Sequence, residues 1–152
     1  VLAPSQSHLD SLKQETQRQS YAWEKVRGEF EHLPFFFLRE GDFKDEARRL
    51  SLDQSIASDG AFAAAMLADM GEVTEKRGPW FYRNVHWEAG MIGHLLYLAA
   101  EAEGLQATGM GAFHDDETHQ FLGLDNQGRW QDVYHFGVGR AVSSGRVSIE
   151  PA

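Results

Sequence analysis

The sequence contains no cysteine, no long uncharged apolar run and no excess of positive charge, and each absence excludes a class of protein. Without cysteine, the 152 residues cannot form disulfides, thiolate metal sites or a cysteine nucleophile. This composition fits a reducing compartment, and we expect a cytoplasmic protein. No stretch of about 18 apolar residues is free of charge, so we expect no transmembrane helix.

The charge balance excludes two kinds of partner. The chain has 14 Lys and Arg against 23 Asp and Glu, which gives a formal net charge of −9. Nucleic-acid phosphates and anionic membrane surfaces need a basic patch, and no cluster of Lys and Arg supplies one, so we expect neither partner. The opening VLAPSQSHLD lacks the basic and apolar regions of a secretory signal. A start at Val1 is compatible with a processed product or with a piece of a longer polypeptide.

The longest apolar pattern runs from Val85 to Leu105 and predicts a long helix. Its apolar residues recur at steps of three and four, as one face of a helix requires. We expect Asn84 to cap the helix and Gly104 to end it. Since the apolar band is wide, the helix should be buried on most sides, in a core or between two subunits. Gly90 and Gly93 would permit close approach of another backbone.

The other patterns predict an α+β domain. We expect a polar helical segment at 8–31, a short apolar strand at 35–38 and a charged helix at 43–50. A short acidic helix at 114–122 and a final strand at 130–142 follow. The alanine-rich segment 61–70 fits a helix or a buried strand, and periodicity does not decide between them. Residues 71–79 are expected to form a charged link. The predicted organisation is a helical N-terminal arm (1–34), a core (35–142) and a polar C-terminal tail (143–152).

Motifs for hydrolytic or phosphate chemistry are missing. No HExxH, GxSxG or GxxxxGK[ST] pattern occurs. Metal ligands could come from His114, Asp115, Asp116 and His119, but an acidic helix start explains these residues better, so we expect no metal. The pairs at 109/111 and 137/139, each Gly-x-Gly, are either ordinary turns or places where a flat cofactor approaches the backbone.

Three stretches together carry a family resemblance. They are LREGDFKDEARRLSLDQSIASDGAFAAAML, EKRGPWFYRNVHWEAGMIGHLLYLAAEAEGLQATGMGAFHDDETHQFLGLD and VYHFGVGRAV. In these stretches the chain resembles the nitroreductase-like flavin oxidoreductases, and within them the SagB-type dehydrogenases associated with thiazole/oxazole-modified peptides. The middle stretch is the most specific, because its arginine, Glu-Ala-Gly, Gly-Leu and Leu-Gly-Leu-Asp occur in the family's order and spacing. The resemblance covers roughly residues 37–142.

The resemblance implies a fold, a cofactor and a partner. The fold is a mixed or antiparallel sheet flanked by helices. The long central helix packs against a second copy or a second nitroreductase-like domain, with Gly90 and Gly93 as close-packing positions at this contact. FMN then lies at this interface, and the implied activity is hydride transfer between the flavin and a small-molecule or peptide substrate. An enzyme is therefore the leading hypothesis.

The resemblance also implies functional residues. A backbone amide near the paired glycines would approach the flavin, a guanidinium would pair with its phosphate, and a lysine would act as acid or base. The cofactor-binding residues so implied are Arg83, Gly109, Met110, Gly111, Phe113 and Arg140, and the catalytic residue is Lys76.

Two departures support a second hypothesis. The family's arginine-rich flavin motif has no match in residues 1–35, so the comparison implies that the chain lacks the N-terminal part of the family domain. Arg77 and Trp80 replace a tyrosine and an arginine of the azoline-oxidising members. The alternative is therefore a degenerate, non-catalytic domain that acts as a dimerising scaffold or binds a partner. An unrelated α+β binding domain is a third reading.

Overall fold

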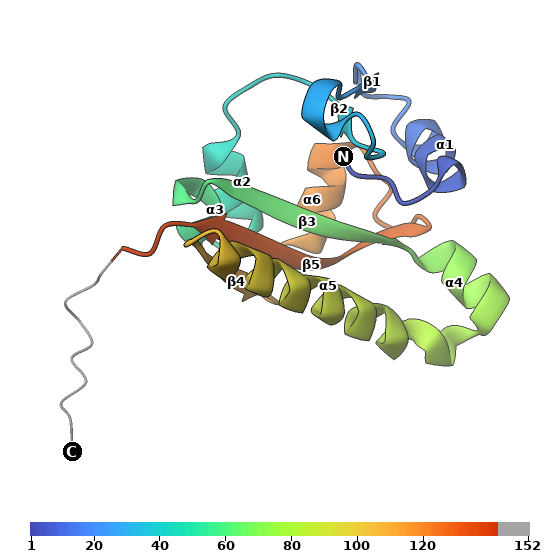
Figure 1. Ribbon diagram of the computed structural model, residues 1–152. Coiled ribbons are helices and arrows are strands. Elements are labelled where there is room, and N and C mark those ends of the chain that lie inside the picture. Colours follow the sequence, from blue (N-terminus) through green and yellow to red (C-terminus); the bar gives the residue numbers. More distant parts are fainter. Residues whose placement is uncertain (143–152) are drawn as a thin grey trace.

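The computed structural model describes residues 1–142 and shows a three-stranded antiparallel sheet with helices on both faces (Figure 1). The central strand is β5 (Trp130–Gly139), which pairs with β3 (Phe62–Asp69) on one side and β4 (Gln106–Met110) on the other. The predicted fold class is confirmed. None of the helices in these residues has both the length and the hydrophobicity of a membrane-spanning segment. The predicted C-terminal tail lies outside the described residues.

One face of the sheet is covered by the predicted long helix, α5 (Tyr82–Ala102). It begins before Asn84, which was wrongly predicted as its cap, because the 3₁₀ turn η2 (Pro79–Phe81) runs directly into it. The predicted stop is confirmed, since Gly104 lies just past the helix with φ of +67°. Glycine adopts this left-handed conformation at little cost, which explains why the helix ends here.

The two glycines of α5 face different surroundings. A Cβ on Gly93 would lie 2.9 Å from Cε1 of Tyr134 and 3.4 Å from Cε2 of Phe136, and Phe136 is fully buried. Gly93 therefore packs α5 against its own sheet, and its predicted place at a subunit contact is wrong. A Cβ on Gly90 would meet nothing within 4 Å, and this glycine is exposed. Its role in a subunit contact stays a prediction.

The opposite face of the sheet carries α2 (Lys44–Leu50), α3 (Ile56–Asp59) and α6 (Asp115–Leu122) (Figure 1). The first and last of these helices agree closely with the predicted segments 43–50 and 114–122. Each begins with acidic residues, which the partial positive charge of a helix N-terminus favours.

The N-terminal segment lies over the same face as these three helices. It contains α1 (Gln6–Glu15), the 3₁₀ turn η1 (Gly28–Phe30) and a two-stranded sheet of β1 (Glu24–Lys25) and β2 (Phe36–Phe37). The prediction of a helical segment up to residue 31 is therefore wrong beyond Glu15. Within this stretch, Glu24 and Lys25 pair with residues of β2 instead of continuing a helix.

The alanine-rich segment and the expected link both form regular structure. Residues 62–69 form the edge strand β3 because they pair along the length of β5, although alanine favours helices. The chain then turns into α4 (Met70–Arg77), where we expected a link. Asp69 caps this helix, since its Oδ1 accepts a hydrogen bond from the Glu72 amide at 2.9 Å.

Candidate functional site

The first residues of the predicted flavin segment serve packing in this chain. Met110 is 2% exposed and lies in the core. The Gly109 amide donates to the hydroxyl of Tyr97 at 2.7 Å. A Cβ on Gly109 would overlap the hydroxyl of Tyr134, whose pKa is raised by burial and, to a lesser degree, by the nearby Tyr97. Position 109 therefore requires a glycine because the Tyr134 side chain lies so close to it.

The next residues form an open loop between β4 and α6. A Cβ on Gly111 would meet nothing within 4 Å, and both Gly111 and Ala112 are exposed. Within residues 1–142, the amides of these two residues donate to no backbone carbonyl. A hydrogen bond holds the loop in place, because Nε2 of Gln54 donates to the Ala112 carbonyl at 3.1 Å. Two unused amides beside open space fit the edge of a flavin ring, which offers hydrogen-bond acceptors.

A buried hydrogen-bonded chain of side chains lies directly behind this loop. Oγ of Ser51 is 2.9 Å from Nδ1 of His135, and Nε2 of His135 is 2.6 Å from Oδ2 of Asp132. Since an ionised carboxylate only accepts, the ring donates from Nε2 and, when neutral, accepts from the serine hydroxyl. Phe113 stacks on the His135 ring with centroids 4.5 Å apart and the planes at 10°. These hydrogen bonds and the stacked Phe113 ring therefore connect the end of α2, the middle of β5 and the loop.

A β-bulge makes this arrangement possible. In a regular strand, residues three apart point to opposite faces of the sheet. Here the β3–β5 register shifts between Met66 and Leu67 and leaves Val133 without a partner, so Asp132 and His135 reach the same face. Sequence reasoning missed this group, because neither the bulge nor the contact with Ser51 leaves a local signal.

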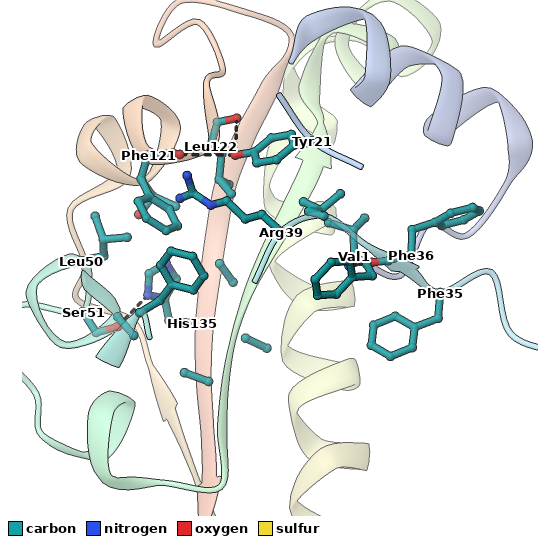
Figure 2. A pocket seen from close by; sticks show the side chains of 18 of the residues that line it. Val1, Tyr21, Phe35, Phe36, Arg39, Leu50, Ser51, Phe121, Leu122 and His135 are labelled. Carbon is teal, nitrogen blue, oxygen red and sulfur yellow. Dashed lines mark hydrogen bonds between the residues drawn. The ribbon is translucent and has the colours of Figure 1, made fainter. Parts of the chain in front are cut away.

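Ser51 and His135 also belong to the wall of an apolar cavity of about 580 Å³ (Figure 2). The cavity lies between the N-terminal segment, β3, α2 and α6. At its edge, the hydroxyl of Tyr21 donates to the Leu122 carbonyl at 3.2 Å, and burial raises the pKa of Tyr21 while the nearby Arg39 opposes this. Neither Gly111 nor Phe113 lines the cavity, so it is separate from the loop described above.

The three predicted cationic residues lie away from the loop. Lys76 is exposed on α4, with Nζ 2.6 Å from Oε1 of Glu72, and this hydrogen bond lowers the pKa of Glu72. Arg83 lies in the first turn of α5, 5.5 Å from the Trp87 ring centroid. Arg140 follows β5 at the end opposite to α4, so the length of the strand, about 30 Å, separates Arg140 from Lys76.

The residues considered as metal ligands do not converge. Across residues 1–142, no group of three or more His, Asp or Glu side chains is placed to hold a metal ion. His119 is buried and accepts a hydrogen bond at Nε2 from the Asp132 amide at 2.9 Å. This histidine therefore has a structural role.

Comparisons with known proteins place the chain in a family. Among solved structures, a protein of Anabaena variabilis assigned as a nitroreductase has a TM-score of 0.65 and 29% identity, with 71% of this chain and 23% of that chain covered. This chain thus spans under a quarter of the length of the Anabaena protein.

Two further structures share the fold over almost the whole chain. The NfrA1 nitroreductase of B. subtilis has a TM-score of 0.56 and 16% identity, covering 99% of this chain and 64% of that chain. A protein of Exiguobacterium sibiricum assigned as a nitroreductase, solved in complex with FMN, has a TM-score of 0.50 and 15% identity, covering 99% and 85%.

Curated proteins give no match. The sequence model described as the nitroreductase family matches residues 3–140, so the family match also includes the N-terminal segment that the motif resemblance did not cover. On this evidence, the chain belongs to the nitroreductase family.

Proposed function

We propose that this chain binds FMN and takes part in a flavin-dependent oxidoreductase of the SagB-type dehydrogenase branch. The observation that carries the proposal is the exposed loop at Gly111, where two unused amides lie beside open space in a chain of this family. When bound, FMN supplies hydride transfer to or from a small organic or peptide substrate.

The residues around the loop would position the cofactor. The amides of Gly111 and Ala112 are the proposed donors to the flavin edge. Gln54 holds the Ala112 carbonyl, and the stacking of Phe113 on His135 fixes the other end of the loop. A loop fixed in this way keeps its donors in place before the cofactor arrives, which reduces the entropy lost on binding.

Three cationic side chains outside the loop are further proposed contacts. An exposed guanidinium such as that of Arg83 or Arg140 can pair bidentately with a phosphate, and we propose both as phosphate contacts. Lys76 is the proposed acid or base. Because β5 separates Lys76 from Arg140 by about 30 Å, we propose that at most one of these two contacts a given flavin.

A Gly111→Val substitution tests the flavin site. The φ of Gly111 is not positive and its Cβ space is open, so we expect thermal unfolding within about 2 °C of the unmodified protein. The branched side chain would occupy the open space beside Gly111, where the flavin edge is proposed to lie. Titration of the protein with FMN, followed by flavin fluorescence, should show an affinity at least about tenfold weaker, which corresponds to the loss of one or two hydrogen bonds. Equal affinity in both proteins would contradict the proposed site.

The outer face of α5 supports a second copy of the chain as partner. Four large apolar side chains lie along this face at helical spacing, each more than half exposed: Trp87 at 61%, Met91 at 62%, Leu95 at 65% and Leu98 at 56%. Exposed apolar stripes of this kind mark interaction surfaces. We propose that two α5 helices pack together through this stripe and form a homodimer.

A Met91→Glu substitution tests the dimer. Methionine and glutamate have similar helix propensities, so α5 should persist, whereas a charge in the centre of the stripe should disfavour burial against a second copy. We expect light scattering coupled to gel filtration to report a dimer for the unmodified protein and a monomer for this variant. Gln127→Glu adds the same charge in an exposed turn and should stay dimeric. A dimeric Met91→Glu protein would exclude the α5 stripe as the contact.

A non-catalytic scaffold is the second candidate function. Packing against Tyr134 is enough to explain the glycine at position 109, without a bound flavin. The apolar stripe of α5 is likewise explained by dimer formation alone. The FMN titration separates the two candidates. A dimeric protein that takes up no FMN would support the scaffold and exclude the oxidoreductase.

A further inference from the structure

The cavity in front of β3 has polar groups in its wall, but most of them already have partners. Ser51 and His135 are hydrogen-bonded to each other, and His135 is also bonded to Asp132. The nitrogen of Val1 donates to the Phe36 carbonyl at 2.6 Å. A molecule that entered the cavity would therefore find few unused polar side chains in its interior, and the part that it buried against these side chains would be apolar.

The rest of the wall is apolar and leaves room. Residues 63–65 of β3 are all alanine, so the side chains that this part of the edge strand brings to the wall are methyl groups. Aromatic and aliphatic side chains complete the wall: Val26, Phe35, Phe37, Phe43, Leu50 and Phe121. The volume of about 580 Å³ falls within the range of roughly 300–1,000 Å³ that small-molecule sites occupy.

Arg39 brings a cationic side chain to the wall of the cavity. The Arg39 guanidinium carbon lies 4.7 Å from the ring centroid of Phe43 and 4.8 Å from that of Phe121, with Tyr21 at 5.8 Å (Figure 2). No carboxylate of residues 1–142 forms a salt bridge with it. A guanidinium that lies over aromatic rings keeps N–H groups at its edge for a planar, bidentate acceptor.

We propose that this cavity binds a small amphiphilic monocarboxylate, with its alkyl or aryl body in the apolar interior and its carboxylate on Arg39. A single guanidinium balances one negative charge. A dianionic phosphate would leave excess negative charge in a protein whose net charge is already −9. The site is separate from the loop at Gly111, so this inference does not rest on flavin binding.

Calorimetric titration of the full chain with decanoate tests the proposal, with decan-1-ol as the neutral probe of equal length. Decanoate should bind the unmodified protein. Arg39→Gln removes the charge of an exposed side chain, so the protein should fold normally, and its affinity for decanoate should fall about 10- to 100-fold. The affinity for decan-1-ol should not change with this substitution.

Arg77→Gln is the matched control, because Arg77 also lies over a phenylalanine ring, at 5.5 Å from Phe81, but outside the cavity. It should leave the decanoate affinity unchanged. Three outcomes would overturn the proposal: no binding of decanoate, equal affinity in the Arg39→Gln protein, or displacement of decanoate by FMN. The last would assign the cavity to the flavin.

Discussion

An Asp132→Ala substitution is expected to lower the free energy of unfolding by about 3 kcal/mol. Asp132 accepts from Nε2 of His135 at 2.6 Å, and both residues are buried, at 7% and 4% exposed. Without the carboxylate, a buried ring N–H loses its acceptor, and the desolvation cost of this group then lowers the free energy of unfolding. Urea unfolding followed by circular dichroism measures the change.

The same substitution should also loosen the candidate flavin loop. Phe113 stacks on the His135 ring, so a histidine that is no longer held by Asp132 gives the loop a less rigid support. We expect faster amide hydrogen exchange in residues 111–113 than in the unmodified protein.

Asp132→Asn is the matched control, because its side-chain oxygen still accepts from Nε2 of His135. Its amide nitrogen takes the place of Oδ1, which is buried without a partner, so the free energy of unfolding should fall, but by less than in the alanine variant. A smaller loss of unfolding free energy in the alanine variant than in the asparagine variant would show that Asp132 does not stabilise the fold through this hydrogen bond.

A Gly109→Ala substitution is expected to destabilise the fold by about 2–3 kcal/mol. The added methyl group would overlap the hydroxyl of Tyr134 and lie 2.6 Å from its Cζ. Tyr134 has little room to retreat, because its Cε1 is 2.9 Å from the position that a Cβ on Gly93 would occupy. The tyrosine is thus held between β4 and α5, and chemical denaturation should report a lower midpoint for the variant.

A double-mutant cycle with Tyr134→Ala isolates this contact. Once the ring is gone, alanine at position 109 has nothing to overlap, so the coupling energy between the two substitutions should be at least about 1 kcal/mol. Gly111→Ala is the control, since no atom lies within 4 Å of its added methyl, and its effect should be below about 0.5 kcal/mol. Additive effects at positions 109 and 134 would refute the packing role of Gly109.

Local patterns in the sequence were enough to predict the elements that carry their own signals. The helix α5 has a sustained apolar period and a glycine stop, and both are properties of neighbouring residues along the chain. The strand β5 and the acidic start of α6 were found for the same reason. The family resemblance added the sheet and its flanking helices, which the structure of residues 1–142 confirms.

Residues distant in the sequence decided what the local patterns could not. The segment 62–69 became a strand because β5 offers it a hydrogen-bonding edge, which outweighs the helix propensity of alanine. Gly93 lies on the face of α5 that packs against the sheet, because the rings of Tyr134 and Phe136 lie beside it. Residues 24–25 pair with residues 36–37 and so form a strand where a helix was expected.

By itself, the sequence determined the long helix and the short glycine-containing loop, since each depends on residue type and spacing within one stretch. Its resemblance to a known family, carried by three stretches together, indicated the fold family. Only the tertiary structure decided which glycine serves packing and which leaves open space. It also placed Ser51 within hydrogen-bonding distance of His135, 84 residues away, and formed a cavity beside Arg39. These features arise from side chains that meet only after the sheet forms, and no local period or propensity encodes such a meeting.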